Sequence, residues 1–322
     1  MNVLVTGATG FVGGHLVDAL LARGDTITAL VRDPGKAKEL IRRGVGLVVG
    51  DLDDVPALER AARDQEVIYH LAGLIAARDE AEFLRVNRDG TERLVTAAER
   101  VGASRLVLIS SLAAGGPSEP DRPLVGVERP QPVTRYGRSK LAGEEVVRAA
   151  RLSWTIIRPP VVYGPGDREM LRVFRAASLG IAPVFGDGSQ RLSLVFGPDL
   201  AGAIVAAGTA AHTAGAVYYP CHPETITSRE LVTIVGRAVG KRVLRIGIPG
   251  PVGRALLWTT DTAARLTGRA TLLSLDKAAE FLAPAWTADP GPLTQATSWS
   301  ATHDFETGAR RTVEWYRARG WL

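Results

Sequence analysis

The segment at residues 6–13, which reads TGATGFVG, constrains the fold of this 322-residue chain more than any other feature. It joins a short apolar run at residues 3–5 to a segment at residues 11–23 whose apolar side chains have helical spacing. Glycines at such a junction permit a tight turn, leave backbone N–H groups open to an anion, and let the helix pack closely on the strand. The pattern therefore predicts a dinucleotide phosphate site; the alternative is a turn with a purely structural role.

Strands and helices alternate through the first half of the chain. Continuous apolar runs predict strands near residues 3–5, 26–31, 46–49, 67–71, 106–109 and 155–157. Amphipathic spacing predicts helices between them at residues 11–23, 55–63, 80–101 and 134–150. This order is typical of an α/β protein whose parallel sheet is covered on both faces, so we expect a Rossmann-type doubly wound parallel sheet.

The pattern changes after Arg158, where Pro, Gly and aromatic residues become frequent. We expect residues 1–160, together with about 192–216, to form a dinucleotide-binding domain. About 161–191 and 217–322 are expected to form a smaller, irregular α+β substrate-binding domain. Within it, residues 284–304 have no clear period and are interpreted as a long loop, followed by a final helix at about 306–319.

Composition argues against several other classes of protein. The net charge is +5, but the basic residues are scattered, which does not favour nucleic-acid binding. The single cysteine, Cys221, cannot form an intrachain disulfide, and five dispersed histidines predict no metal site.

With no N-terminal leader, we expect a cytoplasmic protein. The apolar stretch at residues 200–219 is interpreted as a buried helix; membrane contact is not expected, although residues 254–266 could form an amphipathic membrane-touching helix.

The end of the second predicted strand distinguishes two forms of the cofactor. NAD-dependent enzymes usually place Asp or Glu there, to accept a hydrogen bond from the ribose 2′-OH. Arg32 instead offers charge-assisted bonds to a 2′-phosphate, and Lys36 or Lys38 could add a second cation. We therefore expect NADP(H). The alternative is NAD(H), with Asp33 at the ribose and Arg32 as a solvated surface charge.

A tyrosine and a lysine four residues apart stand near the start of the helix predicted at residues 134–150. Tyr136 and Lys140 share one helix face, so the phenol and the ammonium point the same way. A free tyrosine has a pKa of about 10, whereas an acid/base catalyst works best near the operating pH. A neighbouring ammonium stabilises the phenolate, and Ser111, at the end of the fifth strand, can hydrogen-bond a substrate oxygen. The alternative is an amphipathic surface helix without a chemical role.

Taken together, these segments resemble the extended branch of the short-chain dehydrogenase/reductases, the NAD(P)-dependent epimerase/dehydratase family. The matching segments are TGATGFVG at 6–13, HLAG at 70–73, N-x-x-G-T at 87–91, the serine pair at 110–111, Y-x-x-x-K at 136–140 and RPPVVYGPG at 158–166. The resemblance implies that Ser111 positions the substrate and Tyr136 is the acid/base. It also implies that Lys140 holds the nicotinamide ribose and lowers the tyrosine pKa.

The resemblance and the strand ends also imply further contacts. Asn87 would support the helix or a proton-relay water, and the loop at 158–166 would pass the nicotinamide. A homodimer would form through the helices at 80–101 and 134–150. The residues expected to contact the cofactor are Thr6, Gly7, Thr9, Gly10, Phe11, Val12, Gly13, Arg32, Lys36, Asp51, Leu52, Leu71, Ala72, Gly73, Asn87, Tyr136, Lys140, Pro159, Val161 and Val162.

Departures from the sugar-nucleotide members narrow the expected reaction. An apolar pair follows Ser111 where the 4,6-dehydratases carry two acidic residues. Residues 113–116 read AAGG where many epimerases have Val-Tyr-Gly, and Arg191 is shifted by one residue from their diphosphate-binding arginine. Residues 31–34 and 192–196 instead resemble the dihydroflavonol-reductase and 3β-hydroxysteroid-dehydrogenase-like branch, whose members act on hydroxyl or carbonyl groups of apolar molecules.

We therefore expect hydride transfer between NADP(H) and a secondary alcohol or ketone of a small molecule. Leu256, Leu257 and Trp258 either line an apolar pocket or belong to the core. Two alternatives stay open. A nucleotide-sugar epimerase would oxidise and re-reduce one carbon with retained NAD(P), and a non-catalytic NADP(H)-binding subunit or sensor would bind the cofactor without turnover.

Overall fold

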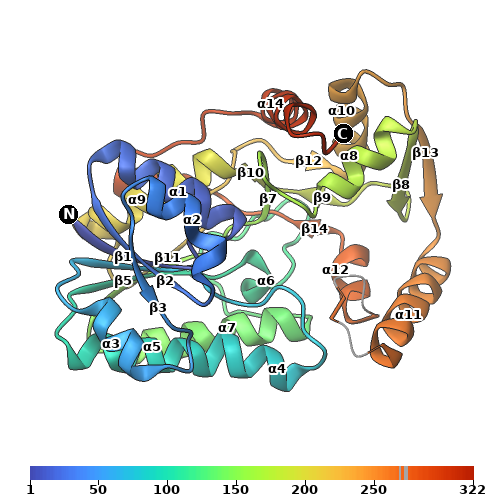
Figure 1. Ribbon diagram of the computed structural model, residues 1–322. Helices are drawn as coiled ribbons and strands as arrows, with labels where there is room; N and C mark the ends of the chain where they lie inside the picture. The colour runs from blue at the N-terminus through green and yellow to red at the C-terminus, as the bar shows by residue number, and fades with distance from the viewer. Residues whose placement is uncertain (268–269, 272–274) are drawn as a thin grey trace.

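A seven-stranded parallel sheet forms the centre of the larger part of the molecule (Figure 1). The computed structural model describes residues 1–267, 270–271 and 275–322. The strand order is β11-β6-β5-β4-β1-β2-β3, and each neighbouring pair is parallel. The strands are β1 (Asn2–Thr6), β2 (Thr26–Val31), β3 (Gly46–Val49), β4 (Val67–His70), β5 (Arg105–Ile109), β6 (Ser153–Ile157) and β11 (Ala216–Tyr218). This topology confirms the predicted Rossmann-type sheet.

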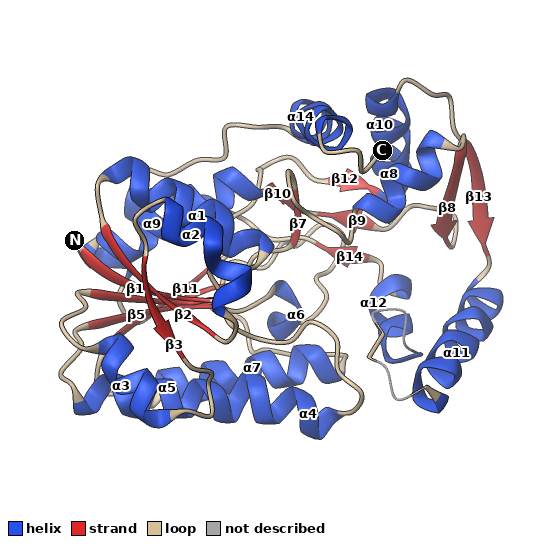
Figure 2. Ribbon diagram, in the orientation of Figure 1, coloured by secondary structure: helices blue, strands red, loops and turns tan. Residues whose placement is uncertain are grey.

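Helices cover both faces of this sheet (Figure 2). One face packs against α1 (Phe11–Arg23) and α9 (Gly197–Thr209), and the other against α3 (Val55–Ala62), α5 (Gly90–Arg100) and α7 (Arg135–Arg148). Shorter helices, α2 (Lys38–Arg42), α4 (Glu80–Leu84) and α6 (Leu112–Gly115), lie beside them. None of the helices in the described part of the chain is both long and apolar enough to cross a membrane.

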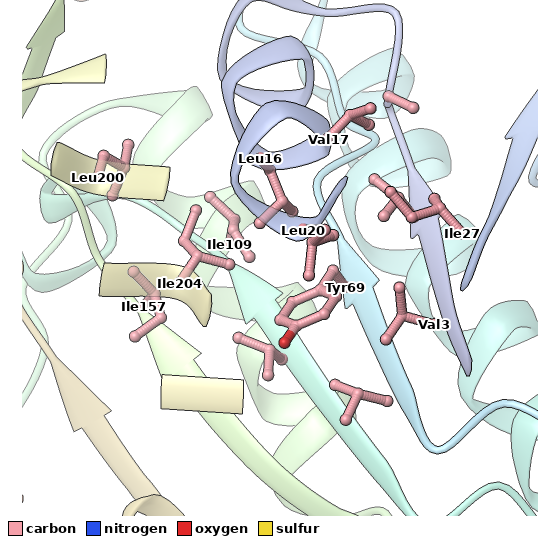
Figure 3. Close-up of a cluster of buried hydrophobic side chains, with 14 of the residues drawn as sticks. Val3, Leu16, Val17, Leu20, Ile27, Tyr69, Ile109, Ile157, Leu200 and Ile204 are labelled. Atoms are coloured by element: carbon pink, nitrogen blue, oxygen red, sulfur yellow. The ribbon is translucent and has the colours of Figure 1, made fainter. Parts of the chain in front are cut away.

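The core between the sheet, α1 and α9 is apolar (Figure 3). Val3, Leu16 and Ile204 have no exposed surface. The ring of Tyr69 occupies the centre of this core, where Gly208 carries no side chain. A Cβ added to Gly208 would lie 2.3 Å from the Tyr69 hydroxyl oxygen, so the close approach of α9 to the sheet depends on this glycine.

The remaining elements form a smaller part beside the carboxyl ends of the strands (Figure 1). Its strands are β7 (Val161–Tyr163), β8 (Ile181–Phe185), β9 (Arg191–Leu192), β10 (Leu194–Phe196), β12 (Ile226–Thr227), β13 (Leu244–Ile248) and β14 (Ala285–Trp286). Its helices are α8 (Leu171–Ser178), α10 (Ser228–Val239), α11 (Gly250–Leu266), α12 (Ala278–Leu282) and α14 (Phe305–Ala318). α13 (Gly291–Thr297) instead packs against α9 and the core of the large sheet. α8, α10 and α14 share one apolar cluster with β8 and β10.

The helix predicted at residues 80–101 is present as α4 and α5, which follow one another without a break. A turn of π-helix, Arg85–Asp89, joins α4 to α5 and was not predicted. The wider turn lets Asn87 make hydrogen bonds to other parts of the chain, and amphipathic periodicity does not reveal such an insertion.

Two sequence predictions were wrong in part in the second half of the chain. The apolar stretch at 200–219 is a buried helix only as far as Thr209, where α9 ends; a 3₁₀ turn (Ala211–Thr213) and strand β11 follow, and β11 adds to the sheet edge beside β6. The expected loop at 284–304 contains β14 and α13. β14 has only two residues and pairs with the distant β9, so no local period marks it.

Candidate active site

The glycine-rich segment forms the turn between β1 and α1. Gly7 has a φ of +77°, in the left-handed region that glycine adopts without strain. A Cβ on Gly13 would lie 2.1 Å from the Gly7 carbonyl oxygen, so only glycine allows α1 to approach this turn so closely. α1 begins after Gly10 with no side-chain cap and no acidic residue in its first turn. Its N-terminal N–H groups and positive dipole end therefore fit the pyrophosphate of a dinucleotide.

The predicted contacts at this turn differ in burial. Thr9 and Gly10 are exposed, whereas Phe11 and Val12 are partly buried. Thr6 is fully buried, and its hydroxyl is used inside the protein: Oγ1 lies 2.7 Å from His70 Nδ1 and accepts from Ala72 N at 3.2 Å. The Thr6 side chain therefore fixes the ends of two strands, and a cofactor contact of this residue stays a prediction.

The end of β2 carries two exposed cations, Arg32 and Lys36. Neither has an ion-pair partner within the residues that the structure describes. Asp33, the alternative ribose ligand, caps the 3₁₀ turn Pro34–Ala37 by accepting from Gly35 N at 2.8 Å. The carboxylate is thus engaged in the turn, while the two cations are accessible to an anion.

The ends of β3 and β4 complete this edge of the sheet. Asp51 is exposed and accepts from Asp53 N at 2.8 Å, and Leu52 packs against α5 where Gly90 has no side chain. The segment Leu71, Ala72 and Gly73 is at most partly buried. These predicted contacts therefore all lie at the carboxyl edge of the sheet, where ligands of doubly wound folds bind.

A buried histidine ends β4. His70 Nε2 lies 3.0 Å from Thr91 Oγ1, so both of its ring nitrogens are hydrogen-bonded within the protein. Burial, and to a smaller extent the charge of Lys140, lowers the pKa of His70 to about 3. His70 is therefore a neutral ring that joins β1, β4 and α5.

Ser111 and Tyr136 come together at one end of a cavity. Ser111 follows β5 and caps α6, its Oγ accepting from Ala113 N at 3.2 Å. Burial raises the pKa of Tyr136 to about 12; hydrogen bonding to Ser111 lowers it, and the Glu280 carboxylate raises it. The direction is opposite to the lowering expected from Lys140, because removal of the phenol from water outweighs the attractive contacts. The phenol is thus protonated at neutral pH and can donate a proton.

Lys140 lies one turn after Tyr136 on α7 and is buried. Its Nζ donates to the Ile109 carbonyl oxygen at 2.7 Å. Burial lowers the pKa of Lys140 to about 8, while the carboxylate of Glu144 raises it. A Cβ added to Gly73 would lie 3.8 Å from this Nζ, so the ammonium faces the segment that follows β4.

Asn87, in the π-helical turn, connects the sheet edge to α7. Its Oδ1 accepts from Leu74 N at 2.8 Å, and its Nδ2 donates to Leu74 O at 3.0 Å and to Ser139 Oγ at 2.9 Å. Asn87 is only 4% exposed. Of the two roles implied for Asn87, this geometry supports the one in which it holds the helix in place.

The loop after β6 passes from the sheet to the glycine turn. Pro159 O accepts from Leu112 N at 2.9 Å, which fixes the loop beside Ser111. Val161 lines the cavity, and Val162 packs against the core around α1. Farther along, His15 Nε2 on α1 hydrogen-bonds Pro165 O at 2.9 Å, so the loop reaches α1.

A buried ion pair next to the helix of Tyr136 and Lys140 was not predicted. Arg158 donates from Nε and Nη2 to the two oxygens of Glu144 at 2.8 and 2.6 Å, and from Nη1 to the Tyr219 hydroxyl at 2.7 Å. Glu144 also accepts from Ser110 Oγ at 2.5 Å. The network joins the ends of β5, β6 and β11 to α7, and so fixes Ser111 relative to Tyr136 and Lys140. Helical spacing was the available signal, because residues 136, 140 and 144 share one face.

An unpredicted cap lies over the start of α7. Asp276 accepts from Arg135 N at 2.8 Å, and Glu280 accepts from Thr134 Oγ1 at 2.8 Å. Lys277 Nζ lies 5.1 Å from the centroid of the Tyr136 ring, within range of a cation–π contact. No local pattern marks this segment, since it lies about 140 residues along the chain from its partners.

The cavity that begins at Ser111 and Tyr136 has a volume of about 690 Å³. Its walls are mostly apolar and come from α8, β8, α10, β13, α11 and β14. They include Val173, Val184, Phe185, Leu231, Ile248 and Trp286. Leu256 and Leu257 also line it, so the predicted pocket role of this pair is supported, whereas Trp258 lies outside and is 57% exposed.

Known proteins are similar to this chain in sequence and in fold. A ceramide reductase of Caulobacter vibrioides is 36% identical over 99% of this chain and 96% of its own length. A UDP-glucose 4-epimerase of Mycolicibacterium smegmatis is 34% identical over 74% of this chain and 83% of its own. The solved structure of UDP-glucose 4-epimerase of Thermus thermophilus with NAD superposes with a TM-score of 0.79, at 25% identity, over 98% of this chain and 99% of that one.

The family model also matches the part of the chain that carries the chemistry. The model described as "NAD dependent epimerase/dehydratase family" matches residues 3–218, which include the glycine turn, Ser111, Tyr136 and Lys140. The chain therefore belongs to the NAD-dependent epimerase/dehydratase family and is an NAD(P)-dependent enzyme of the extended short-chain dehydrogenase/reductase type.

Proposed function

We propose that this enzyme uses NADP(H) to interconvert a ketone and a secondary alcohol on a long, apolar, lipid-like substrate. The observation that carries the proposal is the cavity of about 690 Å³, whose walls are mostly apolar and include Ser111 and Tyr136. Such a cavity accommodates an alkyl chain, with the reacting oxygen as the polar end. The similarity to a ceramide reductase, which covers both chains almost completely, supports the same substrate class.

The reaction follows from the positions of the side chains. In the reductive direction the bound dinucleotide supplies a hydride to the carbonyl carbon. Tyr136, whose raised pKa keeps it protonated, donates its proton to the developing alkoxide, and Ser111 hydrogen-bonds the same oxygen. The ammonium of Lys140, held beside the end of β4, offsets the negative charge left on the phenolate.

Arg32 and Lys36 support NADP(H) over NAD(H). Both cations are exposed at the end of β2, where the adenine ribose binds in such folds, and Asp33 is engaged in a turn. Because related solved structures contain NAD, the preference of this enzyme for NADP(H) has to be measured on the enzyme itself. We expect Arg32→Asp to raise the KM for NADPH by about tenfold or more, with little change for NADH.

The test uses turnover measured by NADPH absorbance with a series of 3-oxo-acyl amides of increasing chain length. We expect KM to fall as the chain lengthens, and Tyr136→Phe to lower kcat by about 10²–10⁴ while NADPH still binds. Conversion of UDP-glucose to UDP-galactose without net absorbance change would favour the epimerase. Cofactor binding without turnover of either substrate would favour a sensor.

The proposal also includes the localisation and the oligomeric state of the enzyme. We place it in the cytoplasm, where NADP(H) is available, as a homodimer that pairs α5 and α7 of each subunit. Sedimentation equilibrium tests the dimer, and a single monomeric species would contradict it.

A further inference from the structure

The strand pair β8 and β13 presents an apolar outer face. The pair is parallel, with Leu244 opposite Ile181 and Ile246 opposite Pro183, so these side chains project from the same side. Leu244 is 69% exposed, Ile246 45% and Ile181 42%. Apolar side chains gathered on an exposed strand pair indicate a binding surface rather than a solvated edge.

The same outer edge of the molecule continues into α11, which follows β13 (Figure 1). Val252 and Trp258 are each 57% exposed and Leu256 is 50% exposed. Val252 and Leu256 are one turn apart, and the buried face of the helix contains Gly253 and Leu257. Leu256 and Trp258 are two residues apart and therefore lie on different sides of the helix, with Leu256 beside the buried face. We call the exposed side chains Ile181, Leu244, Ile246, Val252 and Trp258 the edge surface.

Exposed cations stand next to the edge surface in the sequence. Lys241, Arg242 and Arg254 are all exposed, and none has an ion-pair partner within the described parts of the chain. No acidic residue occurs in the sequence between Glu230 and Asp261. The surface is therefore apolar with a positive border, which complements a surface of anionic headgroups over hydrocarbon.

The catalytic cavity reaches this same surface. Leu256 lines the cavity and is half exposed, and Ile248, from the end of β13, lines it as well. Ser111 and Tyr136 line the same cavity. A single cavity therefore connects α11 to the two hydroxyls, and an alkyl chain that enters beside α11 would lie between its apolar walls.

We propose that the edge surface docks onto an anionic lipid bilayer and that the substrate passes from the bilayer into the cavity beside α11. The inference rests on the proposed lipid-like substrate and adds where that substrate is taken up. The sequence left open whether residues 254–266 form a membrane-touching helix; the exposure of Trp258 and the position of Leu256 and Leu257 at the cavity support contact. The helix would lie in the interface rather than cross it.

Vesicle co-sedimentation tests the docking with full-length enzyme. We expect binding to vesicles of phosphatidylglycerol mixed with phosphatidylcholine, and at least about tenfold weaker binding to phosphatidylcholine alone. Val252→Ser/Trp258→Ser and Lys241→Glu/Arg242→Glu should each weaken binding to the mixed vesicles by about tenfold. Val127→Ser, at a side chain that is 89% exposed elsewhere, and Arg310→Glu/Arg311→Glu are the matched controls and should bind as the unmodified enzyme does.

Turnover separates this inference from the proposed function. The edge variants should reduce a short-chain soluble ketone at the normal rate and a vesicle-embedded long-chain ketone at least about fivefold more slowly. An enzyme that reduces both ketones but never binds vesicles would overturn the docking alone. Failure to reduce either ketone would overturn the proposed function instead. If the edge variants convert a dimer to a monomer and leave vesicle binding unchanged, the edge surface holds a second copy and the membrane assignment is wrong.

Discussion

Replacement of His70 by Gln tests whether the junction of β1, β4 and α5 depends on an uncharged ring. The pKa of His70 is about 3 in the folded protein, against 6.5 in an unfolded chain. Below pH 6.5 the unfolded chain binds a proton that the folded protein does not, so folding loses free energy as the pH falls toward 3. At pH 5 the loss is about 2 kcal/mol relative to pH 7.5, because 1.5 pH units below the unfolded pKa correspond to about 1.36 kcal/mol each.

The assay is equilibrium unfolding in urea of the unmodified enzyme and of His70→Gln at both pH values. Other groups also titrate in this range: burial raises the pKa of Asp167 to about 6, which acts in the opposite direction. Both proteins contain Asp167, so the difference between their stability curves isolates His70. We expect that difference to shrink by about 2 kcal/mol from pH 7.5 to pH 5. A constant difference would refute the argument, since His70 would then be protonated as easily when folded as when unfolded.

Two other predictions concern the ion pair and the glycine turn. Glu144→Gln leaves the Arg158 guanidinium buried without its carboxylate and should destabilise the fold by about 3–5 kcal/mol in urea unfolding, whereas Glu144→Gln/Arg158→Met should recover much of this loss. If the double variant is no more stable than the single one, the unpaired charge is not the cause. Gly13→Ala should weaken NADPH binding by about tenfold or more in calorimetric titration, because its Cβ would lie 2.1 Å from the Gly7 carbonyl oxygen. Gly14→Ala, whose Cβ would meet nothing within 4 Å, is its neighbouring control and should bind NADPH normally.

The sheet could be predicted from the sequence because its signals are local. Each buried parallel strand is a short apolar run, and the glycine turn marks the junction of β1 with α1. The second half offered weaker signals: β9, β12 and β14 have two residues each and pair only with one another. The stability of such short strands depends on tertiary packing, so no short stretch of the sequence predicts where they form.

The placement of Tyr136 and Lys140 on one helix was also predictable, while the side chains that hold this helix in place were not. Tyr136 and Lys140 share a helix face, so their proximity follows from spacing alone. Arg158 was assigned only to a loop, because nothing in its neighbourhood indicates that Glu144 is its partner. The raised pKa of Tyr136 was missed for a related reason, since burial of the phenol and the charge of the distant Glu280, which both raise this pKa, depend on the tertiary structure.

The second half of the chain therefore decides between the reactions known among relatives of this enzyme. The family model ends at residue 218 and spans Ser111, Tyr136 and Lys140, and the relatives include both a reductase and an epimerase. An epimerase must hold a nucleotide diphosphate while the sugar turns over, and a diphosphate requires cations or backbone N–H groups. Arg191, the residue nearest in sequence to the expected ligand, is paired with Asp121 and Thr225 and does not line the cavity. The walls contributed by residues 170–286 are instead mostly apolar, which favours an alkyl chain and hence net hydride transfer on a lipid-like ketone.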